Sequence, residues 1–238
     1  LHAIQTIKAM YDITGEKKYK ISFSNIWDGI LKNDRHNTGG FSSGERACGN
    51  PYDLRAIETC CTIAWMALTA DMLDLSDDSY VADELELSTW NGLLGAQQTN
   101  GRSFTYNTPM IGDKKASAHE IVFQAVAGSS ELNCCSVNGP RGIGMIGEWG
   151  VTVDGEQITV NYYGASETTI TTAGGRRVTV LQSGSYPFGA DLKIQIKADA
   201  DYAGNIRLRI PFWSENTVLL RNGKAVEGIT PRSYFTVE

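Results

Sequence analysis

The spacing of the hydrophobic residues changes once along this 238-residue chain, close to residue 149, and this change constrains the fold more than any other feature. Up to about residue 148, apolar residues recur every three or four positions, which is the period of a helix with one buried face. From about residue 149 they alternate with polar residues, which is the period of a strand. We therefore predict an α+β, multidomain fold with a helical domain at 1–148 and an antiparallel β-sandwich at 149–238.

Four apolar stripes predict helices in the first domain. They lie at residues 3–11, 23–31, 61–75 and 87–94. Gly15 is placed to end the first helix, and Asp77 or Asp78 is placed to cap the fourth. Because the connections between the stripes are short and polar, we expect antiparallel helical hairpins.

Three dipeptides predict tight turns between strands of the second domain. They are Asp154-Gly155, Gly174-Gly175 and Asn222-Gly223. Short strands joined by such turns are typical of an antiparallel sandwich. The chain begins at Leu1 without an initiator methionine and ends inside the last predicted strand, so we expect a piece of a longer protein with an incomplete sandwich.

Composition excludes several classes of protein. Lys and Arg number 21 against 27 Asp and Glu, which gives a net charge of −6, and no basic cluster points to a nucleic-acid partner. No apolar run reaches the roughly 18 residues of a membrane-spanning helix. Five cysteines in a chain of this length are too few, and odd in number, for a disulfide scaffold. Oligomeric state and compartment stay open at this point.

The cysteines instead suggest a metal site or a reactive thiol, since four of them form two vicinal pairs, Cys60-Cys61 and Cys134-Cys135. Thiolates are soft ligands that suit zinc, and Glu58, Cys60, Cys134 and Cys135 would supply three sulfurs and one oxygen. On a regular helix, residues two apart diverge by roughly 200°. Glu58 and Cys60 can therefore share an ion only where the helix has not yet begun, and the helix is predicted to begin near Glu58.

The alternative to a metal site is that these residues have a purely structural role. Cys61 shares the third stripe with Trp65 and Leu68, so it is expected to be a core cysteine, because free cysteines are often buried. The ligand spacing is also unlike that of a zinc finger, whose ligands come as two closely spaced pairs.

Glu45 lies in the loop sequence Gly44-Glu45-Arg46, where a carboxylate is usually just solvated. If Glu45 shares a cleft with reactive thiols, a catalytic role is expected for it, because glycosidases use paired groups on either side of the scissile bond. The three histidines, His2, His36 and His119, are scattered and are interpreted as surface or capping residues.

The order of several motifs resembles a known family. The motifs are Glu58-Thr59-Cys60, the stretch from Trp90 to Gln97, Phe104-x-Tyr106-x-x-Pro109, Cys134-Cys135-x-x-Asn138-Gly139-Pro140-Arg141, Tyr186-Pro187 and Arg209-Ile210-Pro211-x-Trp213. In this order they resemble glycoside hydrolase family 127, the β-L-arabinofuranosidase family, or a close relative in the same clan. The resemblance runs from about Tyr11 to the end of the chain.

The resemblance implies a fold and a set of site residues. The fold would be the C-terminal part of an (α/α)6 toroid followed by a β-sandwich, with the sugar-contacting histidines of the family outside this chain. The implied zinc ligands are Glu58, Cys60, Cys134 and Cys135. Cys134 would also be the nucleophile, Glu45 the acid/base and Tyr106 a sugar contact. Cys134-Cys135 is followed here by Ser-Val where the better-studied branch has Pro-Pro, which leaves the substrate open.

The leading hypothesis is thus a retaining glycoside hydrolase that releases L-arabinofuranose, or a related sugar, from a plant-type arabinose-containing glycan or oligosaccharide. A second hypothesis gives the zinc a purely structural role, since a site closed by four protein ligands is the usual structural pattern. A third is a carbohydrate-binding module that uses aromatic side chains of the sandwich, such as Tyr162, Tyr163 and Trp213.

Overall fold

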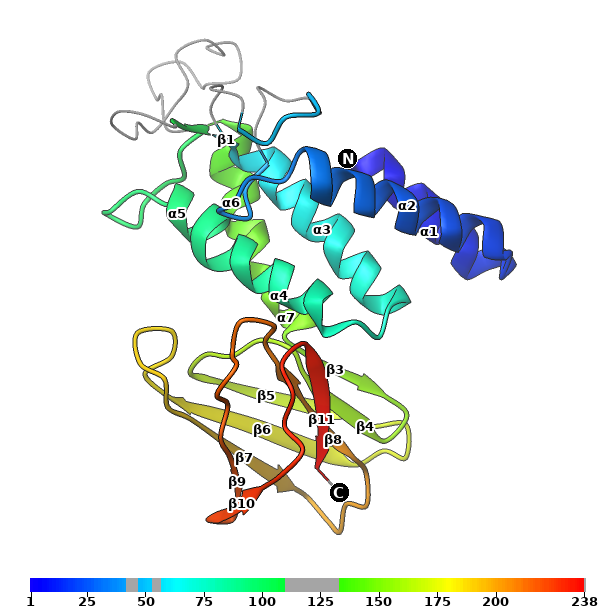
Figure 1. The fold of residues 1–238 in the computed structure, drawn as a ribbon, viewed down its shortest axis with the longest axis vertical. Helices are drawn as coiled ribbons and strands as arrows, with labels where there is room; N and C mark the ends of the chain where they lie inside the picture. The colour runs from blue at the N-terminus through cyan, green and yellow to red at the C-terminus, as the bar shows by residue number, and fades with distance from the viewer. Residues whose placement is uncertain (42–46, 53–56, 110–132, 238) are drawn as a thin grey trace. The chain divides into compact units, whose positions relative to one another are not determined.

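The computed structural model describes residues 1–41, 47–52, 57–109 and 133–237, and it has the α+β character that the sequence predicts (Figure 1). Two compact units divide the chain. The first holds residues 1–77 and 84–145 and is helical; the second holds residues 78–83 and 146–238 and carries the larger sheets. Among the described residues, no helix is both long enough and apolar enough to cross a membrane.

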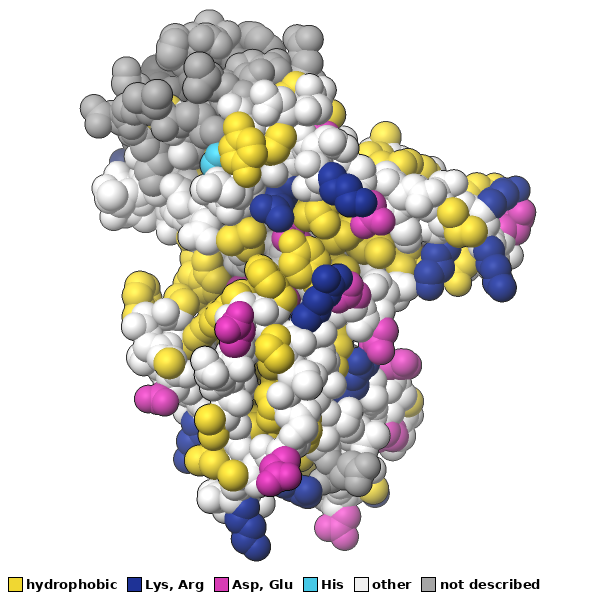
Figure 2. Space-filling model, in the orientation of Figure 1, with side chains coloured by type: hydrophobic (Ala, Val, Ile, Leu, Met, Phe, Trp, Pro, Cys, Tyr) yellow, Lys and Arg dark blue, Asp and Glu magenta, His cyan; other side chains and the backbone are white. Residues whose placement is uncertain are grey.

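The helical unit opens with a hairpin of two helices. A short 3-10 helix, η1 (His2–Ile4), leads into α1 (Gln5–Thr14), which is followed by α2 (Lys17–Asn33). Gly15 ends α1 as predicted, because it takes a left-handed φ of 68° and its N–H donates to the Tyr11 carbonyl. Ile13 and Ile21 leave their side chains exposed, and apolar side chains are visible on this unit in Figure 2.

The third helix, α3 (Thr59–Leu75), is the central one of this unit, and every residue from Thr62 to Thr69 is buried. Trp27 of α2 stacks on Trp65 at 5.5 Å between ring centroids. The prediction that Cys61 is a buried core cysteine is wrong, since it is only half-buried. A helix enclosed on all sides has no polar face, so its apolar spacing cannot show which residue at its end reaches the surface.

The predicted helix at 87–94 is a succession of three segments, α4 (Ser79–Leu87), a π-helical turn η2 (Ser88–Leu93) and α5 (Leu94–Ala96). The predicted cap is confirmed at Asp78, whose Oδ1 accepts from the Tyr80 N–H at 3.0 Å.

The last helices are α6 (Cys134–Gly144) and α7 (Ile146–Trp149). Gly139-Pro140 is a dipeptide typical of turns, but both residues lie inside α6. The glycine serves close packing rather than a turn, because a Cβ on Gly139 would lie only 2.2 Å from the Phe104 ring. Gly142 is equally crowded, with Ile63 at 2.4 Å, so α6 approaches its neighbours closely on this face.

Two sheets make up most of the second unit. The first has the order β11-β8-β4-β3, with strands at Ser233–Val237, Ile206–Ile210, Gln157–Val160 and Val151–Asp154. The second has the order β5-β6-β7, at Ser166–Thr171, Arg177–Gly184 and Leu192–Ala198. A separate hairpin joins β9 (Leu219–Arg221) to β10 (Lys224–Val226).

The three predicted turns are confirmed, but the fully antiparallel sandwich is wrong at one pairing. β4 and β8 run parallel, with Ile158 opposite Ile206 and Val160 opposite Leu208. The three strands of the second sheet lie between them in the sequence, so no tight turn joins this pair. Alternating burial shows which face of a strand is inside but not which way its neighbour runs.

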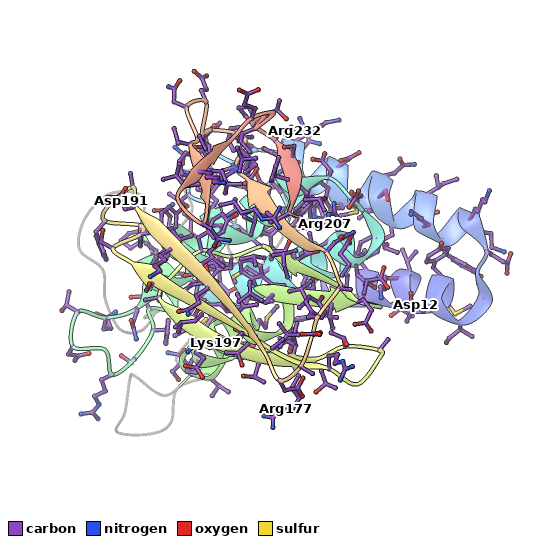
Figure 3. The ribbon with its side chains drawn as sticks, turned by 90° about the horizontal axis from the view of Figure 1, so that it is seen from below. Asp12, Arg177, Asp191, Lys197, Arg207 and Arg232 are labelled. Carbon is purple, nitrogen blue, oxygen red and sulfur yellow. The ribbon has the colours of Figure 1, made fainter. Side chains whose placement is uncertain are left out.

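Residues of both sheets share one hydrophobic core. Ile158 and Val160 of β4, Val178 and Val180 of β6 and Leu208 of β8 are buried together. On the second sheet, Arg177 and Lys197, labelled in Figure 3, are exposed on neighbouring strands.

One of the aromatic residues considered for sugar binding belongs to this core. Tyr163 is 8% exposed, and its hydroxyl donates to the carbonyl of Arg209, which is itself fully buried and paired with Asp83. The expectation that Tyr163 offers an exposed binding face is therefore wrong, while Trp213 is 53% exposed.

Candidate metal centre

Four of the predicted site residues come together in the helical unit. The side-chain donor atoms of Glu58, Cys60, Cys134 and Cys135 all lie within 4.8 Å of one another. The Cys135 sulfur is 3.2 Å from that of Cys60, 4.0 Å from that of Cys134 and 3.0 Å from Oε1 of Glu58. Among the described residues, this is the one group of three or more His, Cys, Asp or Glu side chains that is arranged to hold a metal ion. Glu45 and His119 lie outside the described residues.

Glu58 reaches the same point as Cys60 because the backbone changes conformation between them. Glu58 ends the short strand β1 (Ile57–Glu58) with an extended backbone, φ −93° and ψ 129°, and α3 begins at the next residue. Its Oε2 accepts from the Cys61 N–H, so Glu58 also caps α3. The divergence expected on a regular helix therefore does not arise.

A two-residue ladder holds β1 in place. β1 pairs with β2 (Asn107–Thr108), and the Thr59 N–H donates to the Tyr106 carbonyl at 3.0 Å. Tyr106 is 1% exposed and packs against Cys135. The structure thus puts Tyr106 beside the cluster, and its contact with a sugar stays a prediction.

The vicinal cysteines are the first two residues of α6, and a capping box fixes them there. The Asn133 side chain accepts from the backbone N–H of Cys135 and Ser136, while the Asn133 N–H donates to the Ser136 hydroxyl. Cys135 is fully buried, whereas Cys134 is half-buried. Only Cys134 of this pair is open to a molecule arriving from solvent.

All three thiols sit in the first turn of a helix, Cys60 in α3 and the vicinal pair in α6. The positive end of a helix dipole favours a thiolate over a thiol. Without a cation, burial and the hydrogen bond with Cys60 raise the pKa of Cys134 to about 11, although a hydrogen bond with Tyr106 opposes the shift. The pKa of Cys135 is raised by its hydrogen bond with Cys60, by burial and by the nearby charge of Glu58. The raised pKa values keep the free thiols of Cys134 and Cys135 protonated at neutral pH, so a cation that binds these two sulfurs must displace protons.

Asn138 lies in the motif that follows the vicinal cysteines, and its sequence position alone predicts no role for it. Its Nδ2 donates to the Cys60 sulfur and to the Cys134 carbonyl, both at 3.2 Å. The available signal was its spacing, since a residue four positions after Cys134 lies one helical turn further along α6.

A turn at residues 35–41 borders the cluster and was not predicted to have a role. Phe41 lies beside Glu58, because its carbonyl accepts from the Glu58 N–H at 3.3 Å and its own N–H donates to the Thr62 hydroxyl. Arg35, at the other end of the turn, holds the Glu84 carboxylate through two contacts of 2.8 and 2.9 Å.

The described histidines stay outside the cluster, as expected. His2 contacts Gln5 at the surface, and His36 contacts the Thr38 hydroxyl within the turn at 3.0 Å. Burial lowers the pKa of His36, and the charge of Arg35 lowers it further.

Comparison with solved structures shows the same fold in glycoside hydrolases. A GH127 β-L-arabinofuranosidase from Geobacillus stearothermophilus T6 superposes with a TM-score of 0.80 and 23% identity, over 98% of this chain and 38% of that one. A second GH127 β-arabinofuranosidase gives a TM-score of 0.80 and 22% identity, over 99% and 39% of the two chains.

A curated relative shows similarity in sequence. It is a non-reducing end β-L-arabinofuranosidase of Bifidobacterium longum subsp. longum, 26% identical over 218 residues. The match covers 85% of this chain and 32% of the relative, so the chain spans about a third of the relative's length.

Family comparison covers both units. Residues 2–148 match the GH127 catalytic domain of β-L-arabinofuranosidases, and residues 157–238 match the middle domain of the same family. The two matched segments follow each other along the chain, with the catalytic domain first and the middle domain second. The chain therefore belongs to glycoside hydrolase family 127.

Proposed function

We propose that this chain is part of a retaining glycoside hydrolase that releases L-arabinofuranose, or a related sugar, with a zinc-bound cysteine thiolate as nucleophile. The observation that carries the proposal is the cluster of three sulfurs and one carboxylate within 4.8 Å. Relatives that are named as β-L-arabinofuranosidases support the sugar. A plant-type arabinose-containing glycan is the proposed source of that sugar.

Zinc is the proposed ion because the donor set and its spacing suit it. In a tetrahedral site with Zn–S bonds of about 2.3 Å, neighbouring sulfurs lie about 3.8 Å apart. The observed separations of 3.2 and 4.0 Å fall on either side of that value. Glu58, Cys60, Cys134 and Cys135 would be the four ligands.

Cys134 is the proposed nucleophile. The Cys135 sulfur is buried against the Glu58 carboxylate at 3.0 Å, and the Cys60 sulfur already accepts from Asn138. Cys134 is half-buried at the start of α6. When bound, zinc keeps the thiolates deprotonated at neutral pH.

The reaction follows from these roles in two displacements. The Cys134 sulfur attacks the anomeric carbon, the bond to the departing oxygen breaks, and Glu45 gives that oxygen its proton. Water then attacks the same carbon, the carbon–sulfur bond breaks, and Glu45 takes the proton of the water. Two inversions retain the configuration. Tyr106 is the proposed sugar contact.

We also propose that the helical unit is the later part of an (α/α)6 toroid. The α1–α2 hairpin and the likeness to two solved GH127 structures support this reading.

Cys134→Ser in the full-length protein tests the reaction. We expect loss of turnover on aryl β-L-arabinofuranosides, with zinc analysis run on the same sample. Cys61→Ala is the matched control, because Cys61 neighbours a proposed ligand but lies outside the cluster, and it should keep both zinc and activity. Full activity of Cys134→Ser would overturn the nucleophile assignment, and zinc retained without any wild-type activity would favour the structural role.

A further inference from the structure

We propose that Asn133 is a substrate-binding residue whose side-chain amide donates a hydrogen bond to the 2-hydroxyl of the sugar held at Cys134. The inference rests on the proposed glycosidase function and deepens it, because it names a sugar contact that neither the metal ligands nor the nucleophile supplies. Asn133 directly precedes Cys134 at the start of α6.

The side-chain amide of Asn133 uses only its oxygen within the protein. Oδ1 accepts from the backbone N–H of Cys135 at 3.0 Å and from that of Ser136 at 3.2 Å. Nδ2 has no hydrogen-bond partner among the described residues, although Asn133 is only 6% exposed. Because buried N–H groups nearly always have an acceptor, this one indicates an acceptor that a bound molecule supplies.

The capping box fixes the direction of this donor. Two backbone N–H groups of α6 can be bonded only by the amide oxygen, so the oxygen and the nitrogen of Asn133 are distinguished. Since Oδ1 faces the first turn of the helix, Nδ2 faces away from it. The Asn133 N–H donates to the Ser136 hydroxyl at 3.0 Å, and that hydroxyl donates to the Asn133 carbonyl at 2.7 Å. The donor is therefore held firmly, one residue before the proposed nucleophile.

Asn107 provides a second buried polar atom near the metal centre. It lies opposite Glu58 in the ladder of β1 and β2, and residues directly opposite each other in an antiparallel pair project to the same face. Its Oδ1 is buried and, in the part of the chain that the structure describes, has no hydrogen-bond partner. The two asparagines thus offer one donor and one acceptor, and a sugar with several hydroxyl groups can satisfy both.

The 2-hydroxyl is the sugar group that best suits the Asn133 donor. The Cys134 sulfur attacks the anomeric carbon, and the 2-hydroxyl is on the carbon next to it. The ring oxygen is equally near, but it gains positive charge in an oxocarbenium-like transition state, so an N–H donor there would oppose the reaction. Hydrogen bonds to the 2-hydroxyl instead strengthen in the transition state. Loss of this bond should therefore lower kcat more than it raises KM.

The test measures kcat and KM of the full-length protein on an aryl β-L-arabinofuranoside and on its 2-deoxy analogue. Asn133→Ser is the informative variant, because serine keeps a helix-capping oxygen but lacks the amide donor. We expect its kcat/KM to fall about 10- to 100-fold on the arabinofuranoside and less than about threefold on the 2-deoxy analogue, which has no hydroxyl to lose. Its zinc content should stay at the wild-type value.

Ser136→Ala is the matched control, because it breaks the capping box but leaves the Asn133 amide in place. It should lower the melting temperature and keep the wild-type ratio of kcat/KM between the two substrates. Equal losses on both substrates in Asn133→Ser, or no loss on either, would overturn the inference and leave the proposed function intact. A wild-type protein that cleaves neither substrate would overturn both. If Asn133→Ser does not fold, Asn133→Asp decides the outcome, since its carboxylate caps the helix but cannot donate.

Discussion

The sulfur atoms of Cys60 and Cys135 lie 3.2 Å apart, although 75 positions separate the two residues in the sequence. Their approach joins the N-terminal turns of α3 and α6, and it is closer than the 4.0 Å between the neighbouring Cys134 and Cys135 sulfurs. Mild oxidation of the metal-free chain with diamide should therefore join Cys60 to Cys135, with both thiol protons and two electrons passing to the reagent. Peptide mapping identifies the bond. A Cys134–Cys135 product, or equal oxidation in the zinc-loaded chain, would contradict the arrangement.

Gly139→Ala should destabilise the chain, because the added methyl group would overlap the Phe104 ring at 2.2 Å. Overpacking of this kind costs about 1–3 kcal/mol. Gly144, in the same helix, has nothing within 4 Å of its would-be Cβ, so Gly144→Ala serves as the control. It should be neutral or stabilising by up to about 1 kcal/mol, as alanine is the better helix former. Urea unfolding of the two variants measures the difference, and equal midpoints would show that the contact can relax.

Local features of the fold could be predicted from the sequence. Asn222-Gly223 predicts a hairpin turn because both central residues must take positive φ, and they do, at 51° and 81°. Gly15 ends α1 for a similar reason. The parallel pairing of β4 with β8 could not be predicted in this way, since it depends on strands almost fifty residues apart and leaves no mark on the spacing within either.

In the candidate site too, local backbone features could be predicted from the sequence and tertiary contacts could not. The extended backbone at Glu58 and the helical one at Cys60 follow from where α3 begins, which the sequence indicates. The meeting of these residues with Cys134 and Cys135 was expected from donor chemistry and from the family resemblance, not from periodicity. The contact of Asn138 with Cys60 could not be predicted, because the sequence of α6 does not show which side chain tertiary packing brings to this asparagine.

The metal-free chain should lose stability as the pH rises from about 9 to about 11. The folded state raises the pKa of Cys134 from 9.0 to about 11, chiefly through burial, so it holds this proton more tightly than the unfolded state does. The stabilisation is complete below the unfolded value and disappears as the pH passes the folded value. Urea midpoints across this range measure the loss. Cys134→Ala should reduce it and the control Cys48→Ala should not, while an unchanged slope in Cys134→Ala would assign the loss to other groups.

Arg35→Ala should lower the free energy of unfolding by more than is usual for a substitution in a turn. It leaves the Glu84 carboxylate, which is only 2% exposed, without the guanidinium that holds it at 2.8 and 2.9 Å. Removing one partner of a buried ion pair costs about 3–5 kcal/mol. Because Arg35 begins the turn that places Phe41 beside Glu58, zinc affinity should fall together with stability.

Two further variants separate the ion pair from a general effect of charge removal. Glu16→Ala removes the exposed partner of Lys18 and should leave the free energy of unfolding almost unchanged, because water screens an ion pair at the surface. The double variant Arg35→Met/Glu84→Leu removes both buried charges and should recover much of the loss in stability, because neither partner is left unpaired. A double variant less stable than Arg35→Ala would show that the pair contributes through specific geometry at the 35–41 turn rather than through mutual neutralisation.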